Sequence, residues 1–199
     1  MNRTTAIVVG AMVVIAAGLV ASTLRAPDVP TYAPTRAEPR DAGAALVGPV
    51  LLTVDATAAD RWRHFSFRLG AVVDEADGDW DLAFRRYQII ANGGAGFRGR
   101  GGVRDLGPVA FDAVKTVPAD GYVENETRER NSAIATWYDY GFFSHVLRPK
   151  PHVWAVRTAS GRYAKLALVS YYCPGSQPGC VTLRYVFQGN GSTTMAPSP

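Results

Sequence analysis

Histidine, the side chain best suited to hold an iron or zinc ion, is scarce in this chain. It occurs only at His64, His145 and His152. Pro149 and Pro151 keep the segment between the last two histidines extended, so both imidazoles are not expected to reach one small metal ion. Each histidine alone is able to ligate a haem iron from one side. The competing interpretation for each is a surface histidine, or one satisfied by a hydrogen bond.

The densest group of aromatic residues lies just before these histidines. Residues 136–145 read TWYDYGFFSH. Such a stretch offers a platform for a planar ligand, such as haem or a sugar ring. The alternative is an ordinary strand whose rings fill the core, and the composition favours that alternative.

Two further segments resemble ligand-binding motifs, but the residues around them do not match what those motifs require. Residues 94–99 match G-x-G-x-x-G, but Pro108 and further glycines follow where a dinucleotide site needs a helix, so we predict a flexible Gly/Arg loop between strands. Residues 77–81 alternate carboxylates as calcium loops do, yet Leu82 and Gln88 occupy the positions where an EF-hand needs Gly and Glu. A looser calcium site is the alternative to a solvated turn with Trp80 buried.

Catalytic patterns are also missing. Ser144 adjoins His145, but neighbours along a strand point to opposite faces, so the two cannot form a nucleophile–base pair there. No other pairing of nucleophile and base is evident, and we predict that the protein is not an enzyme. A net charge of +4 over 199 residues is too small to indicate nucleic-acid binding.

The only two cysteines, Cys173 and Cys180, frame the loop CPGSQPGC. On one side, residues 163–172 place Leu166 and Leu168 on one face of a strand, and on the other, residues 181–187 are β-branched and aromatic. They predict a hairpin whose turn is closed by a Cys173–Cys180 disulfide in an oxidising compartment. Further strands are expected at 62–67, 84–90 and 152–158. No window outside the leader has a helical stripe, so we predict an all-β fold of twisted antiparallel sheets, sandwich-like in form.

The N-terminal residues indicate export. Residues 4–24 carry no charge and lie between Arg3 and Arg25, which predicts a signal peptide or a membrane-anchor helix over residues 1–25. The positive amino end favours an extracytoplasmic domain. Four prolines in 26–43 predict an extended linker, 44–188 form the all-β domain, and 189–199 are expected to be a disordered tail.

Three segments together resemble the HmuY family of haem-binding proteins. They span 62–73, 79–94, and 157–172 with 182–188, and they include the blocks W-D-L-A-F-R-R at 80–86 and Y-A-K-L at 163–166. The similarity covers roughly residues 47–188. It implies twisted antiparallel sheets, a periplasmic or cell-surface location, membrane-anchored or secreted, and capture of haem for delivery to an outer-membrane transporter.

The resemblance also implies axial haem ligands between the glycine-rich loop and the final hairpin. In this chain that stretch contains His145 and His152, with Tyr140 nearby, and these are the predicted haem-binding residues. The predicted function is therefore haem binding for iron acquisition. The alternative is a surface adhesion module that recognises a glycan or a protein without haem, and an exported hydrolase is the third hypothesis.

Overall fold

The computed structural model describes residues 2–23 and 28–197. Its single α-helix, α1 (Arg3–Thr23), lies in the predicted leader. Within the described part of the chain, no helix combines the length and apolarity needed to cross a membrane. The signal-peptide or anchor assignment therefore stays a prediction.

The larger sheet is antiparallel and has five strands in the order β1-β11-β10-β9-β6. Its long central hairpin joins β10 (Tyr163–Cys173) to β11 (Gln177–Gln188) through the short 3-10 turn η3 (Pro174–Ser176). The outer strands are β1 (Leu46–Asp55), β9 (Trp154–Arg157) and β6 (Gly102–Asp105). The disulfide Cys173–Cys180 closes the tip of this hairpin, which confirms the predicted pairing.

A second antiparallel sheet packs against the first. It runs β3 (Ala71–Val73), β2 (Arg63–Ser66), β4 (Leu82–Arg85) and β5 (Gln88–Ala91), and the 3-10 turn η1 (Glu75–Asp77) follows β3. The rings of Phe65 in β2 and of Phe67 just after it meet Tyr185 of β11 edge to face, with centroids 5.6 and 5.3 Å apart. All three rings are buried, so the core lies between the two sheets and the predicted sandwich-like all-β fold is confirmed.

One predicted strand is wrong. Residues 84–90 form parts of two strands, β4 and β5, which turn back on each other at Arg86. Arg86 has a positive φ of 53°, a conformation usually left to glycine or asparagine, so nothing in the sequence marks the turn.

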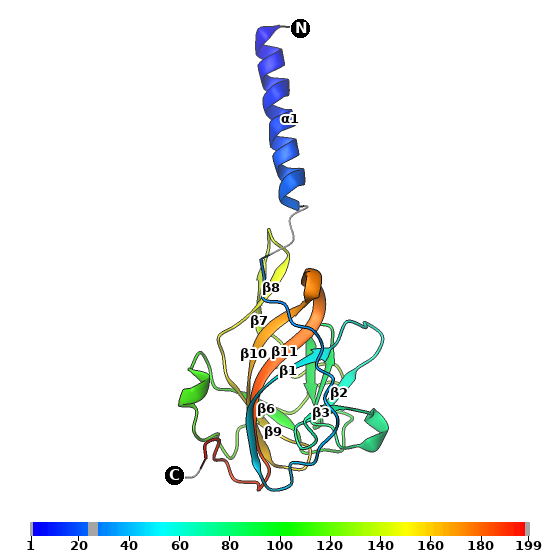
Figure 1. The fold of residues 1–199 in the computed structure, drawn as a ribbon, viewed down its shortest axis with the longest axis vertical. Helices are drawn as coiled ribbons and strands as arrows, with labels where there is room; N and C mark the ends of the chain where they lie inside the picture. Colours follow the sequence, from blue (N-terminus) through cyan, green and yellow to red (C-terminus); the bar gives the residue numbers. More distant parts are fainter. Residues whose placement is uncertain (1, 24–27, 198–199) are drawn as a thin grey trace.

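The third sheet is the separate hairpin of β7 (Tyr138–Gly141) and β8 (Val146–Pro149). Figure 1 shows it projecting at one end of the body, while β6 and β9 lie toward the other end. The remaining short turn, η2 (Phe111–Ala113), lies in the long connection after β6.

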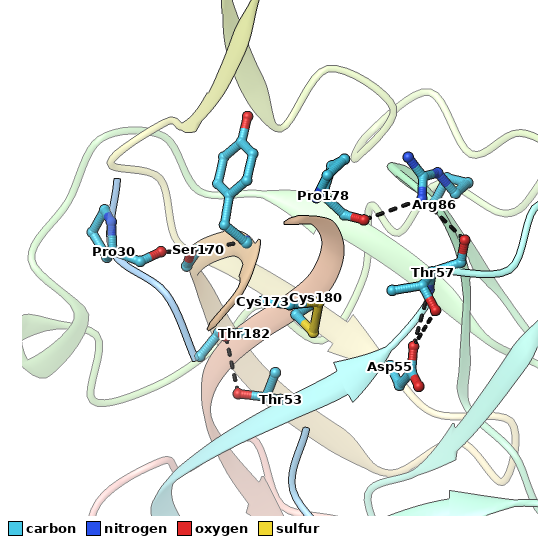
Figure 2. The surroundings of a disulfide bond; sticks show 11 residues. Pro30, Thr53, Asp55, Thr57, Arg86, Ser170, Cys173, Pro178, Cys180 and Thr182 are labelled. Atoms are coloured by element: carbon cyan, nitrogen blue, oxygen red, sulfur yellow. Dashed lines mark hydrogen bonds between the residues drawn. A yellow bond between two sulfur atoms is a disulfide. The ribbon is translucent and has the colours of Figure 1, made fainter. Parts of the chain in front are cut away.

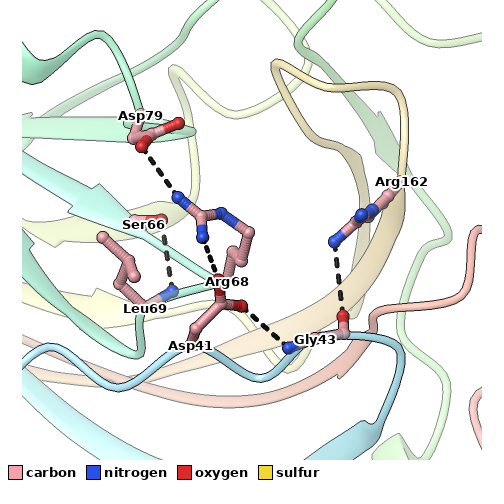
Figure 3. Close-up of polar contacts among 7 residues, drawn as sticks. All are labelled: Asp41, Gly43, Ser66, Arg68, Leu69, Asp79 and Arg162. Atoms are coloured by element: carbon pink, nitrogen blue, oxygen red, sulfur yellow. Dashed lines mark hydrogen bonds and ion pairs between the residues drawn. The ribbon is translucent and has the colours of Figure 1, made fainter.

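The described part of the predicted linker, residues 28–43, is extended but lies on the domain; we call it the strap. Its backbone pairs with Tyr172 through Tyr32 N, with Thr53 of β1 through Thr35 N, and with Leu69 through Arg40 N, all at 2.9 Å. Figure 3 shows a second attachment, in which the Arg68 guanidinium binds both Asp41 of the strap and Asp79, the latter at 2.7 Å. The strap covers part of the open edge of β1, a common way to protect an edge strand.

The described part of the predicted disordered tail, residues 189–197, also packs on the domain. Met195 is 3% exposed, and its backbone N–H donates to Lys115 O at 2.8 Å. Thr193 O accepts from Val117 N at 2.9 Å. The tail prediction is therefore wrong for these residues, because main-chain hydrogen bonds hold a segment whose small polar side chains do not reveal it.

The glycine-rich loop, residues 93–102, is packed rather than free. A Cβ atom on Gly93 would come within 2.0 Å of Gly101 O, and one on Gly99 within 2.2 Å of Asn92 O. The Asn92 side chain accepts from Gly99 N and donates to Trp80 O. These positions need glycine because the backbone of the loop lies against other backbone atoms, with no room for a Cβ atom. No helix follows the loop, since β6 begins at Gly102.

Candidate functional site

A cleft of about 340 Å³ lies between hairpin β7–β8 and the disulfide-closed tip of β10–β11; we call it the His145 cleft. Its walls come from three parts of the chain that are far apart in the sequence. The lining residues are Arg86, Tyr87, Ser144, His145, Val146, Leu147, Tyr171, Tyr172, Ser176 and Pro178. The cleft is thus mainly aromatic and aliphatic, with one imidazole and one guanidinium.

Buried residues fix the position of the hairpin against the body. Trp137, fully buried at the start of β7, donates from its indole N–H to Tyr87 O at 2.8 Å. Its own carbonyl accepts from Lys150 N at 2.9 Å, just beyond β8. On the other side, Leu147 N donates to the Tyr172 hydroxyl at 2.9 Å. Both strands of the hairpin are therefore tied to the walls of the cleft.

His145 stands at the rim of the cleft, in the turn of the hairpin. It is exposed and has a positive φ of 54°, while its N–H closes the turn onto Gly141 O at 2.7 Å. The Tyr140 hydroxyl and Nδ1 of His145 share a hydrogen bond. In the tautomer in which Nδ1–H donates to the hydroxyl oxygen, Nε2 carries no proton and is left for an external partner, as in a histidine that ligates a metal.

The structure separates His152 from this pair. Nδ1 of His152 lies 3.0 and 2.9 Å from the two carboxylate oxygens of Asp105, on β6. The His152 ring also packs against the Trp154 ring in a tilted arrangement, with centroids 5.7 Å apart. Of the three predicted haem-binding residues, His145 and Tyr140 are therefore in contact with each other. His152 instead contacts Asp105 of β6, at the edge of the larger sheet.

The third histidine is structural. His64 is 7% exposed, with its ring 4.8 Å from that of Trp80. Burial lowers the pKa of His64, so the neutral ring is favoured inside the smaller sheet.

Tyrosines form the floor and sides of the His145 cleft. Tyr171 is 2% exposed, and burial raises the pKa of its hydroxyl to about 12. Tyr87 is 47% exposed and packs edge to face on Tyr138, with centroids 5.9 Å apart. The Tyr171 hydroxyl therefore stays neutral at physiological pH, and the tyrosine walls offer flat faces and hydroxyl groups.

Arg86 contributes the positive charge of the cleft. Its guanidinium donates to Thr57 O at 3.0 Å and to Pro178 O at 3.1 Å, as Figure 2 shows next to the disulfide. Both acceptors are carbonyls, and no carboxylate among the described residues forms an ion pair with Arg86. The charge is thus held in place and is not neutralised, which suits an acidic group on a ligand.

The disulfide supports one wall of the cleft, and we expect its removal to loosen that wall. Replacing both Cys173 and Cys180 with serine is expected to lower the free energy of unfolding by about 2–3 kcal/mol, because the crosslink no longer restricts the unfolded chain. Urea denaturation of the double variant and of the wild type measures the difference. A matched control is Gln177→Ala, at an exposed position in the same tip, which leaves the crosslink intact. Equal unfolding midpoints for double variant and wild type would contradict the structural role.

A larger cleft of about 560 Å³ borders the glycine-rich loop. Its charged residues are Arg68, Arg98, Arg128, Glu75, Asp79 and Asp81. Asp81 is buried there and accepts from Phe67 N at 2.8 Å and from Ala159 N at 3.0 Å, which ties two loops together. Burial raises the pKa of Asp81 to about 6.

The acidic turn at 77–81 borders this larger cleft. Asp79 pairs with Arg68, and Trp80 is buried, as the solvated-turn interpretation predicts. Across the described residues, no cluster of three or more His, Cys, Asp or Glu side chains is placed to hold a metal ion.

Several residues of the His145 cleft were not predicted from the sequence. Arg86 and Tyr87 come from the β4–β5 turn, and Tyr171 and Tyr172 from the end of β10. The Tyr-Tyr pair directly before Cys173 is a usable signal, since adjacent rings at a strand end place one aromatic on each face. The β4–β5 turn carries no comparable signal.

The fold and the site together define a class: an antiparallel β-sandwich with a projecting hairpin and an aromatic cleft beside it. The family model for the HmuY protein matches residues 58–185. The chain therefore belongs to the HmuY family. No curated protein matches it.

Solved structures share the fold at low sequence identity. The apo HmuY analogue of Tannerella forsythia has a TM-score of 0.61 at 18% identity, over 74% of this chain and 99% of that one. A Bacteroides vulgatus protein described as HmuY-like and heme-binding has a TM-score of 0.59 at 19% identity, over 77% of this chain and 98% of that one. A Bacteroides fragilis protein described as a lipoprotein has a TM-score of 0.59 at 19% identity, over 75% of this chain and 93% of that one.

Proposed function

We propose that the protein binds haem in the His145 cleft, as part of haem and iron acquisition outside the cytoplasm. The observation that carries the proposal is the pairing of His145 with Tyr140 at the rim of an aromatic cleft. An imidazole with Nδ1 held and Nε2 exposed is prepared to bind iron. Haem, once bound, supplies the iron that accepts this nitrogen.

The other residues of the cleft fit the remaining parts of a haem. The rings of Tyr87 and Tyr172 and the side chains of Val146 and Leu147 offer apolar surface to a flat macrocycle. The Arg86 guanidinium is a partner for a propionate carboxylate. The lining of the cleft provides one histidine, so we infer that His145 ligates the iron from one side. Tyr140 then acts as its positioning residue, and His152 lies outside the site.

The family and the lipoprotein description of one structural relative support a location outside the cytoplasm. We propose that the leader directs export and that haem passes on to an outer-membrane transporter. Binding without catalysis is part of this proposal, in keeping with the heme-binding description of the Bacteroides vulgatus relative.

Titration of the full-length chain with ferric haem tests the proposal. The expected result is a saturable, one-to-one shift of the Soret band, because one cleft holds one ring with one nitrogen ligand. The full chain is required because the strap forms part of the folded body. A linear, non-saturating rise in absorbance would contradict haem binding, and would favour a family scaffold that recognises a glycan or a protein.

A further inference from the structure

The tip of hairpin β7–β8 exposes two phenylalanine rings that no other part of the described chain covers. Phe142 is 75% exposed and Phe143 is 95% exposed, more than any other large apolar side chain of the described residues. The two rings contact each other edge to face, with centroids 5.4 Å apart. Neither lines the His145 cleft, so ligand binding there does not account for them.

The shape of this feature decides what kind of partner it fits. Phe142 and Phe143 lie in the turn between β7 and β8. Figure 1 shows that this hairpin projects from the body. Arg148 of β8 is exposed and lies opposite Asp139 of β7, the only carboxylate on the two strands, and the half-buried Lys150 follows β8, so the hairpin carries a small positive excess. Exposed aromatic rings above basic side chains match the interface of an anionic lipid bilayer.

The course of the chain places this tip next to the leader. The strap joins the body at Thr31 and Tyr32, which pair with Tyr172, and the hydroxyl of the same Tyr172 accepts from Leu147 in the hairpin. The chain between Thr23 and Asp28 reaches roughly 17 Å at most, even when fully extended. The hairpin end of the body therefore stays close to the uncharged leader, wherever the leader lies.

We propose that Phe142 and Phe143 insert into the surface of a lipid bilayer and orient the domain with its hairpin toward the membrane. The rings enter the boundary between headgroups and acyl chains, while Arg148 remains at the headgroup level. The proposal rests on membrane association of the full chain and is independent of haem binding. It does not require α1 to cross the bilayer.

The test uses the full chain and vesicles of phosphatidylethanolamine and phosphatidylglycerol. Phe142→Cys and Phe143→Cys place an environment-sensitive fluorophore at the tip. Val109→Cys and Asp120→Cys are matched controls, since both are exposed and lie in the connection after β6. The native disulfide keeps the chain's own cysteines from reacting, and circular dichroism confirms that each variant is folded.

On addition of vesicles, the labels at the tip are expected to shift to shorter wavelength and to become about fivefold less accessible to aqueous iodide, because they enter the interface. The control labels are expected to change little. Equal iodide quenching at tip and control positions on vesicles would overturn the proposal, and so would a chain that does not sediment with them. Protection of the tip without vesicles, rising with protein concentration, would instead assign these rings to a second copy of the chain.

Discussion

Replacing Trp137 with alanine is expected to lower the free energy of unfolding by about 3–5 kcal/mol. The indole is fully buried, packs edge to face on Tyr171 with centroids 5.9 Å apart, and donates to Tyr87 O. Its removal leaves a cavity behind the His145 cleft and a carbonyl without its donor. Chemical denaturation measures the loss, which is a large share of a typical domain's stability.

Two further variants separate packing from hydrogen bonding at this position. Trp137→Phe keeps a ring but removes the donor, so we expect a loss of about 1–2 kcal/mol. Trp62→Ala removes a tryptophan that lies under the Arg85 guanidinium and is only partly buried, and we expect a smaller loss than for Trp137→Ala. Equal effects of Trp62→Ala and Trp137→Ala would contradict the assigned role of Trp137.

The second large effect is a pH dependence from Asp81. Burial raises the pKa of this carboxyl from its ordinary value of 3.8 to about 6 in the folded protein. The folded state therefore binds the proton more tightly than the unfolded state, and Asp81 lowers stability most above pH 6. The pKa difference corresponds to a loss of about 3 kcal/mol in the free energy of unfolding at neutral pH. This loss disappears as the pH falls toward 4, because the carboxyl is then protonated in both states.

Other groups titrate in the same range, so the comparison uses Asp81→Asn at each pH. Relative to this variant, the wild type is expected to gain stability between pH 7 and pH 5, measured by urea denaturation. The neutral His64 and the acids with lowered pKa values, such as Asp41, contribute equally to both proteins and cancel. A wild type that loses stability relative to Asp81→Asn on acidification would show that the two backbone donors outweigh burial.

The elements that could be predicted from the sequence are those with local signals. The β10–β11 hairpin has a Pro/Gly turn between a run with alternating leucines and a β-branched, aromatic run, and the two cysteines lie at the ends of that turn. The all-β fold follows from the alternation of such strands. The β4–β5 turn was missed because Arg86 adopts a left-handed conformation without glycine or asparagine nearby.

The strap is extended, as predicted, but the sequence does not show that the strap and the C-terminal segment attach to the domain, and the reason is different. Their prolines and small polar residues are typical of disordered chains. The contacts that hold them are backbone hydrogen bonds, such as Tyr32 N to Tyr172 O and Met195 N to Lys115 O, and these leave no trace in side-chain composition.

The candidate site was predicted in part. His145 and Tyr140 were both named from the sequence, but the hydrogen bond between them depends on the turn of hairpin β7–β8. The aromatic stretch at 136–145 divides: Trp137 enters the core, as an ordinary strand predicts, whereas Phe142 and Phe143 are exposed. Arg86 and Tyr87 reach the cleft only through the contact between distant strands, which sequence spacing does not show.

We propose that His145, and not His152, is the histidine that holds the haem iron. The most direct measurement compares the absorbance spectra and haem titrations of full-length His145→Ala and His152→Ala with those of the wild type. The account predicts that His145→Ala shifts the Soret band and weakens binding by at least about tenfold, while His152→Ala leaves both unchanged. A spectrum that responds to His152→Ala or only to Tyr140→Phe, with His145→Ala unaffected, would contradict it.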